Sequence, residues 1–183
     1  MSAKLLPVLV LAAMLAGCAA TGPRYAETAA DSTSVPEEAS RLVVYRTEAH
    51  RQYAGVAADV KLDGTALGSC DYAGFATFDV PAGIHVLGTD AASTLGKCEI
   101  TIEVRGGNRY YYEISPRVEH YVASTPGLVI SAFGPVGFIV GVVTMLVGQS
   151  SEAARTACGG PFSIAPVSED VAVPALAALH KSN

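Results

Sequence analysis

Apolar and polar side chains alternate with a period of two from Arg41 to about Glu119, which is the pattern of half-buried β-strands. Gly, Pro, Asn and Asp residues interrupt this pattern at intervals of about ten residues, as the turns of an all-β domain do. The predicted strands are 41–47, 58–62, 65–70, 75–80, 84–90, 98–105 and 109–115. About seven short strands with such turns predict a mainly β domain over residues 41–120, as an antiparallel β-sandwich or an open barrel.

The turn sequences fix how these strands connect. Asp63-Gly64 predicts a tight hairpin, because a type I′ turn needs positive φ at both central residues. Pro81-Ala82-Gly83 turns the chain into the next strand, where Ile84 and Val86 are expected to point inward. His85, between them, is then expected on the outer, solvated face.

A long apolar segment follows the predicted β domain. Residues 121–151 contain no charged side chain over 31 positions, and the centre of this run, Leu128–Gly148, is long enough to cross a bilayer. Pro135 suits a helix start and Gly159-Gly160 a helix stop. Three interpretations of residues 121–157 stay open: a helix packed on the sandwich or on a partner, a membrane span, or a Gly-rich hairpin or loop.

The last segment, residues 158–183, predicts a final strand and a short helix. The strand is Phe162–Val167, and Ser168 is in position to cap the helix. Glu169 and Asp170 then fall in the first turn, where the helix dipole favours acidic side chains. Pro174 is expected to break or kink this helix.

The N-terminus has the features of a secretory signal over residues 1–17. Lys4 precedes an apolar stretch, and small residues precede Cys18. The run Leu15-Ala16-Gly17-Cys18 resembles the lipobox of bacterial lipoproteins. That resemblance implies cleavage between Gly17 and Cys18, a diacylglyceryl thioether on Cys18 and acylation of the freed amine. An ordinary signal peptide with a chance cysteine is the alternative.

Residues 18–40 are rich in Ala, Thr, Ser, Glu and Pro and lack apolar periodicity, which predicts a flexible tether. Ala19 follows Cys18 where an Asp would retain a lipoprotein in the inner membrane. By resemblance to known lipoprotein sorting, this implies the outer membrane, facing the periplasm.

Charge and composition restrict the partners. The formal net charge is −5, and the basic residues are scattered, which argues against nucleic acid and against a polybasic membrane patch. The expected partners are a membrane, through lipidated Cys18, and either a protein or the membrane, through Leu128–Gly148. An exposed apolar surface of that size implies such a contact.

Three cysteines besides Cys18 lie in what is expected to be an oxidising compartment: Cys70, Cys98 and Cys158. They allow three pairings with one thiol left over, and Cys70–Cys98 is the first choice. Three buried thiols are the alternative.

Catalytic and metal-binding motifs are missing from the sequence, so no enzyme, cofactor or metal site is predicted. The expected function is a non-enzymatic interaction or structural module, and the alternative is a periplasmic lipoprotein that binds a small ligand or a metal. His50, His85, His120 and His180 are too far apart in sequence to form a ligand pattern. His120 beside Glu119 could form an acid–base pair, but polar loop residues are the simpler interpretation.

Two further groups of side chains have both a functional and a structural interpretation. Tyr110-Tyr111-Tyr112 could present Tyr111 to a partner, although core packing of Tyr110 and Tyr112, with Tyr111 paired across strands, explains the run better. Asp79, Glu99 and Glu103 are interpreted as solvating charges on outer faces rather than as a cation site.

Several motifs together resemble an uncharacterised family of small bacterial lipoproteins. The resemblance covers most of residues 41–175 and includes a hairpin corner of the type Val-Pro-x-Gly-x-His, at Val80–His85. It implies a compact β-sandwich at the cell envelope and no activity. The other matching strings are Tyr45-Arg46, Asp63-Gly64, Gly68–Tyr72, Gly74-Phe75, Gly96–Cys98, Gly107–Tyr112, Cys158–Phe162 and Pro166–Asp170.

Overall fold

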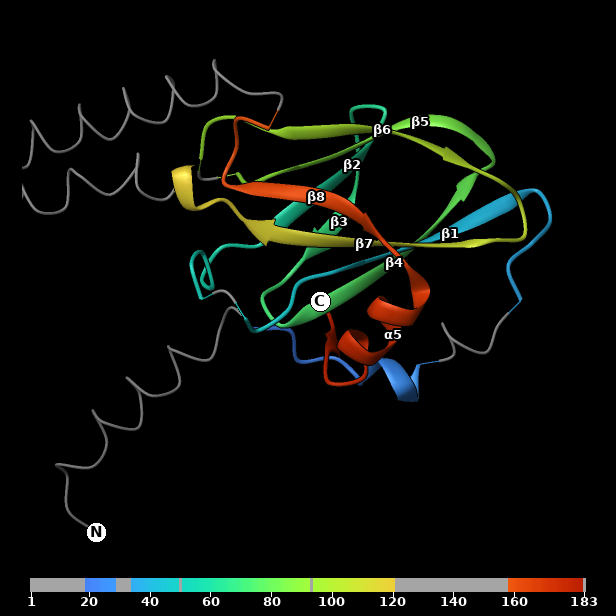
Figure 1. Cartoon of the computed structure of the whole chain (residues 1–183), viewed down its shortest axis with the longest axis horizontal. Coiled ribbons are helices and arrows are strands. Elements are labelled where there is room, and N and C mark those ends of the chain that lie inside the picture. Colours follow the sequence, from blue (N-terminus) through green and yellow to red (C-terminus); the bar gives the residue numbers. More distant parts are fainter. Residues whose placement is uncertain (1–18, 29–33, 50, 93, 121–157, 183) are drawn as a thin grey trace, which may run out of the picture.

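The computed structural model describes residues 19–28, 34–49, 51–92, 94–120 and 158–182, which form a mainly β fold of two sheets (Figure 1). One sheet has five strands in the order β8-β7-β1-β4-β9, and the other has four in the order β3-β2-β5-β6. The predicted β-sandwich is confirmed. Its strands are β1 Ala39–Tyr45, β2 Ala58–Leu62, β3 Thr65–Cys70, β4 Gly74–Pro81, β5 Gly83–Asp90, β6 Cys98–Val104, β7 Arg109–Pro116, β8 Phe162–Val167 and β9 His180–Lys181.

The hairpin between β2 and β3 follows the predicted turn chemistry. Asp63 has φ 50° and Gly64 has φ 80°, as a type I′ turn requires. The bounds of β2, β3 and β8 equal the predicted ones. Local alternation and turn residues were therefore sufficient to place these strands.

The strand directions differ from the purely antiparallel prediction. β1 pairs in parallel with β7, and β4 pairs in parallel with β9. The strands between β4 and β7 in sequence, β5 and β6, belong to the other sheet. The chain therefore returns to β1 by a crossover and arrives parallel to it.

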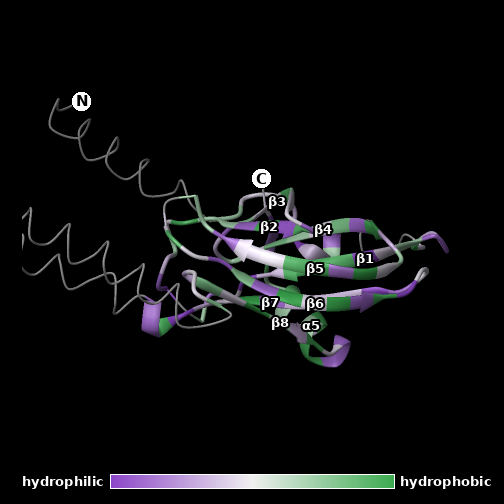
Figure 2. Cartoon of the chain, turned by 90° about the horizontal axis from the view of Figure 1, so that it is seen from above, coloured by the Kyte–Doolittle hydropathy of each residue, from purple (hydrophilic) through white to green (hydrophobic). Residues whose placement is uncertain are grey.

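Two cores lie on the two faces of the five-stranded sheet. The larger core fills the space between the sheets and includes Leu42, Val60, Leu87 and Ile114. Figure 2 shows hydrophobic and hydrophilic residues interspersed along the strands of both sheets. The second core covers the outer face, where α5 (Glu169–Leu176) and η1 (Tyr25–Glu27) pack on Val43, Tyr45, Phe75 and Tyr111. β1 is consequently buried on both faces.

Residues 19–28 are docked on the fold, which corrects the prediction of a flexible tether for this part of residues 18–40. Tyr25 is only 2% exposed, its ring meets Phe75 edge-on, and its N–H donates to the Leu179 carbonyl at 3.1 Å. Ala20 N–H donates to the Tyr72 carbonyl at 3.1 Å. The composition of this segment is polar, but one aromatic ring and a few backbone hydrogen bonds suffice to order it.

The predicted C-terminal helix is present as α5, with Ser168 in the N-cap position. Pro174 lies inside this helix and does not end it, since Ala177 N–H still donates to the Val173 carbonyl. The predicted signal peptide, Cys18 and the apolar segment 121–157 lie outside the described residues.

Candidate functional site

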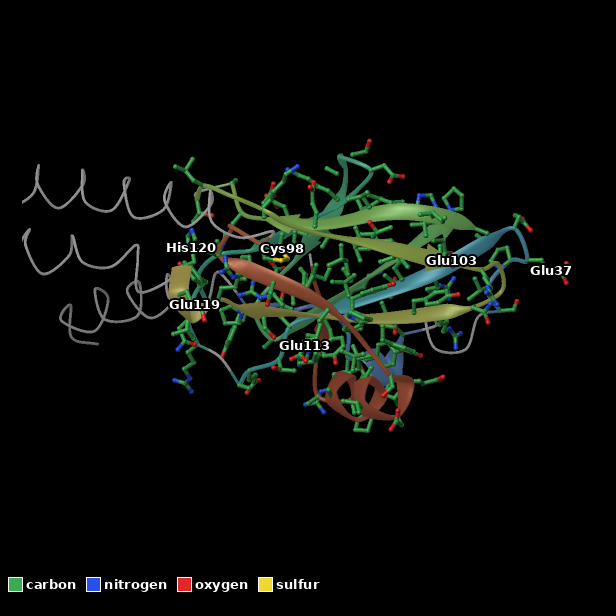
Figure 3. All side chains as sticks on the ribbon, turned by 45° about the horizontal axis from the view of Figure 1, so that its top comes forward. Glu37, Cys98, Glu103, Glu113, Glu119 and His120 are labelled. Carbon is green, nitrogen blue, oxygen red and sulfur yellow. A yellow bond between two sulfur atoms is a disulfide. The ribbon has the colours of Figure 1, made fainter. Side chains whose placement is uncertain are left out.

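The loops that connect the strands lie at the two ends of the sandwich, and the strand directions decide which loops share an end. β1 and β7 run in one direction, and their neighbours β4 and β8 run in the other. The ends of β1, β3, β5 and β7 therefore lie with the starts of β2, β4, β6 and β8. We call this the exit end. Figure 3 shows Cys98, Glu119 and His120 there, and Glu37 and Glu103 at the opposite end.

The first described residue, Ala19, lies at the exit end. It forms a parallel bridge with Tyr72 in the turn between β3 and β4. Ala20 packs against this turn so closely that a Cβ on Gly74 would come within 2.7 Å of the Ala20 Cβ. The chain that follows Cys18 is thus fixed to the sandwich from its first residue.

The chain also leaves the described fold at His120, directly after β7. This side chain is fully buried, and its Nδ1 lies 2.7 Å from the hydroxyl oxygen of Tyr53. Glu119 is exposed, so the pair suggested by their adjacency in sequence is divided between the interior and the surface. His120 is a buried structural side chain here, which corrects its interpretation as an ordinary polar loop residue.

The chain returns to the described fold at Cys158, which forms a disulfide with Cys98 at the start of β6. Gly159 N–H donates to the Lys97 carbonyl at 2.9 Å. Gly160 is packed so tightly that an added Cβ would lie 2.7 Å from the Gly96 carbonyl oxygen. The two glycines therefore allow the backbone at 159–160 to contact the backbone at 96–97. The chain is thus fixed to the sandwich where it returns at Cys158, as it is where it leaves at His120.

This disulfide corrects the first-choice pairing Cys70–Cys98. β3 and β6 form opposite edges of the four-stranded sheet, with β2 and β5 between them. Three strand spacings of about 4.8 Å separate their backbones by about 14 Å, whereas a disulfide needs Cα atoms within about 7 Å. Cys70 is a free thiol in the core, where burial raises its pKa to about 12. It is therefore a poor nucleophile.

Arg46, directly after β1, connects the segments of the exit end, and the sequence predicted no role for it. It is 2% exposed, and its guanidinium donates to the carbonyl oxygens of Val56, Cys70 and Tyr53 at 2.7, 3.2 and 3.2 Å. Its terminal carbon lies 4.5 Å from the centre of the Phe162 ring. Burial lowers the pKa of Arg46, but a guanidinium in a protein stays charged. The sequence signal that could have indicated its burial is its position, because a charged residue directly follows the apolar strand β1.

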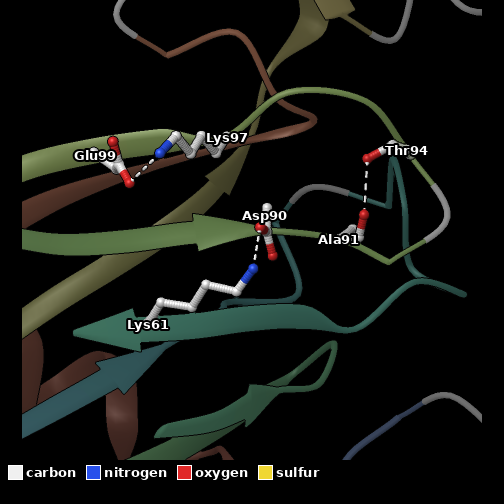
Figure 4. A network of polar contacts seen from close by, with 6 residues as sticks. All are labelled: Lys61, Asp90, Ala91, Thr94, Lys97 and Glu99. Carbon is white, nitrogen blue, oxygen red and sulfur yellow. Dashed lines mark hydrogen bonds and ion pairs between the residues drawn. The ribbon is translucent and has the colours of Figure 1, made fainter. Parts of the chain in front are cut away.

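The surface of the exit end combines apolar side chains with balanced charges. Leu95 is 46% exposed and Val118 is 55% exposed. The Lys61–Asp90 and Lys97–Glu99 ion pairs lie on the four-stranded sheet, and the Thr94 hydroxyl donates to the Ala91 carbonyl (Figure 4). A hollow of about 230 Å³ at this end is lined by Gly55, Val56, Ala57, Asp59 and Ala92.

The opposite end has a larger and more polar hollow. It measures about 400 Å³ and is lined by Glu103, Arg105, Asn108, Arg109 and Tyr110. A neighbouring hollow of about 240 Å³ continues it along β7 and β8 and shares Arg109 and Tyr110.

The other residues singled out from the sequence have structural roles. Tyr111 and Tyr112 are buried on opposite faces of β7, which excludes Tyr111 as an exposed binding ring. Asp79 accepts two hydrogen bonds from Arg41, at 2.7 and 2.9 Å. The His180 ring contacts the Gly22 carbonyl, whereas His50 lies outside the described residues.

β5 has the opposite phase from the predicted one. Ile84 is 73% exposed and Val86 is exposed, whereas Leu87 is fully buried. Leu87 packs in the core between the sheets and therefore sets which face of the strand points inward. His85 is held rather than solvated: its Nδ1 lies 2.7 Å from Asp63 Oδ2, and its Nε2 lies 3.0 Å from the Pro81 carbonyl oxygen.

Asp63 at this corner gives a prediction for pH dependence. Its carboxylate accepts hydrogen bonds from the Val86 N–H and from His85, and these lower the pKa of Asp63. Because the folded pKa lies below the unfolded one, the stabilisation is present above the unfolded pKa and is lost as pH falls through the folded value. We expect Asp63→Asn, which keeps a turn-compatible residue, to be less stable than the parent at pH 7 and equal to it in strong acid.

Chemical unfolding at a series of pH values measures this difference. His85→Gln provides the second arm of a double-mutant cycle, in which the effect of Asp63→Asn should shrink but not vanish. The Val86 N–H bond, which is the larger cause of the shift, remains in that variant. A difference between Asp63→Asn and the parent that does not change with pH would contradict the assignment.

The contacts at the exit end hold chain segments in place. Within the described part of the chain, no group of three or more His, Cys, Asp or Glu side chains could hold a metal ion. Among the same residues, no helix is long and apolar enough to cross a bilayer. The hydrogen bonds, the disulfide and the buried guanidinium all fix the positions at which the chain enters and leaves.

No protein-family model matches the chain, and neither a curated protein nor a solved structure matches it. The resemblance to small bacterial lipoproteins therefore stays a prediction.

Proposed function

We propose that the chain is a lipid-anchored, non-enzymatic protein of the bacterial cell envelope, whose sandwich is an interaction module held close to a membrane. The observation that carries this proposal is the position of Ala19. The lipobox-like run ends at Cys18, and Ala19 is already fixed to the turn between β3 and β4. Acyl chains on Cys18 would therefore hold the sandwich directly against the bilayer, without a flexible spacer.

The energetics favour stable attachment through Cys18. Each buried methylene contributes about 0.8 kcal/mol, and stable anchoring needs two or more chains. A triacylated Cys18 meets this requirement. The apolar run Leu128–Gly148 provides a second contact, with the membrane or with a protein partner. The outer membrane, facing the periplasm, is the proposed location.

Replacement of Cys18 with alanine tests the anchor. We expect Cys18→Ala to abolish incorporation of radioactive palmitate, and the protein to accumulate as an unprocessed precursor or to be released to the periplasm. The measurement is metabolic labelling followed by separation of the membranes by density. Cys70→Ala is the matched control, because Cys70 is a buried free thiol, and it should be labelled and sorted like the parent. Normal processing of Cys18→Ala, or absence of palmitate from the parent, would rule out the anchor.

Binding of a small polar ligand is the second candidate function. The hollow at the end opposite the exit end, about 400 Å³ in volume, favours it, since its arginine and tyrosine side chains could orient an anionic or planar group. Native mass spectrometry of the purified protein would detect the added mass of a bound ligand. Arg105→Ala would then be expected to weaken that binding.

A further inference from the structure

The pairing of β7 with β8 limits how the chain between them can meet a membrane. β7 ends at Pro116 and β8 begins at Phe162, and these two residues are paired across the strands. Arg117 N–H also donates to the Pro161 carbonyl at 2.8 Å, so the two chain ends remain adjacent beyond the strands. A single crossing of a bilayer would place β7 and β8 on opposite sides, which their pairing forbids. Any passage through the membrane must therefore return on the side from which it left.

The sequence of the chain between these two ends favours an apolar surrounding. Residues 121–151 give 31 consecutive positions without a charged side chain. A contiguous apolar surface of that size is typical of a contact with a membrane or a partner.

Three described positions lie together at the exit end. Ala19 leads to the proposed lipid anchor and is fixed at the exit end, and both His120 and Cys158 are fixed there as well. The exposed apolar side chains Leu95 and Val118 come from the loops beside these two residues. The hydrophobic interior of a bilayer favours all three groups found at this end: lipid acyl chains, an uncharged chain segment and exposed apolar side chains.

We propose that the exit end, where the chain leaves at His120 and returns at Cys158, is the membrane-facing surface of the protein. The partner is a lipid bilayer rather than a protein. This orientation rests in part on the proposed lipid anchor, whereas the adjacency of the two chain ends rests on the pairing of β7 with β8. The hollow at the opposite end then points away from the membrane, toward soluble ligands.

Depth-dependent quenching tests this orientation in the full-length protein reconstituted into vesicles of phosphatidylethanolamine and phosphatidylglycerol. A single cysteine is introduced at the exit end, as Val118→Cys or Leu95→Cys, and labelled with an environment-sensitive nitrobenzoxadiazole dye. Ile84→Cys and Glu37→Cys are the matched exposed controls away from that end. Cys70 is buried and Cys98–Cys158 is oxidised, and the parent chain measures any background labelling at Cys18.

We expect spin-labelled lipids to quench the dye at 118 and 95 at least about twofold more than the dye at 84 and 37, since interfacial groups lie within about 10 Å of the acyl chains. Equal quenching at all four positions, or none at the exit end, overturns the proposal. Absence of quenching together with crosslinking of position 118 to another protein would overturn it in favour of a protein partner.

The same experiment separates this proposal from the lipid anchor. Selective quenching at the exit end of the Cys18→Ala chain supports the membrane-facing surface even if palmitate labelling fails. Palmitate incorporation without selective quenching leaves the anchor standing and overturns the orientation. Each proposal can therefore fail without the other.

Discussion

Replacing Arg46 with methionine should lower the free energy of unfolding by about 3–4 kcal/mol, which is a large part of the stability of an ordinary domain. The guanidinium donates to three carbonyl oxygens in an almost fully buried site. Methionine fills a similar volume but removes the guanidinium donor from all three carbonyls, of which that of Tyr53 still accepts from the Val56 N–H. Each buried group left unsatisfied costs about 1–3 kcal/mol. Loss of the contact with the Phe162 ring adds a smaller amount.

Arg46→Lys should retain little of the lost stability. A lysine ammonium is a compact donor at the end of a flexible chain and cannot reproduce the planar fork that reaches Val56, Cys70 and Tyr53 at once. The matched control is Arg105→Met, because the Arg105 side chain is 79% exposed. That variant should change stability by no more than about 0.5 kcal/mol.

Urea unfolding followed by tyrosine fluorescence measures these differences, since the chain contains eight tyrosines and no tryptophan. Hydrogen exchange gives a second readout, because the backbone near Tyr53 and His120 should lose protection first in Arg46→Met. A loss of stability below about 1 kcal/mol would mean that water replaces the guanidinium at little cost. Arg46 would then not be the connection that fixes the exit end.

Local sequence patterns predicted the strands because their causes are local. Alternation with a period of two and an Asp-Gly turn act over a few residues, and β2, β3 and β8 have the predicted bounds. β5 was assigned the wrong phase because both of its faces carry apolar side chains. Only the packing of Leu87 in the core decides between them.

The features of the exit end could not be predicted because they depend on strand order. Cys98 meets Cys158 rather than Cys70 because β3 and β6 are the two edges of one sheet. Arg46 is buried because a loop, a strand and an aromatic ring from distant parts of the sequence surround it. Tyr25 is ordered because α5 and β9, near the other end of the chain, complete its surroundings. None of these neighbours can be inferred from sequence spacing alone.

Removal of the Cys98–Cys158 disulfide should destabilise the protein by about 4 kcal/mol, the value expected from chain entropy for a loop of this length. The two cysteines are 60 residues apart in sequence. The loop they close contains β7 and the whole apolar segment, so the unfolded chain gains much freedom when the link is lost. The double variant Cys98→Ala/Cys158→Ala is the appropriate test, because it leaves no unpaired partner thiol behind.

Three comparisons isolate the disulfide itself. A reductant should lower the unfolding midpoint of the parent to near that of the double variant and leave the double variant unchanged. Cys70→Ala should cost only about 1 kcal/mol, as a small core truncation does, and it should stay sensitive to reductant. If the double variant were as stable as the parent, the hydrogen bond from Gly159 and the packing of Gly160 on Gly96 would be sufficient to hold the returning chain. The disulfide would then be dispensable for keeping the return of the apolar segment at the exit end.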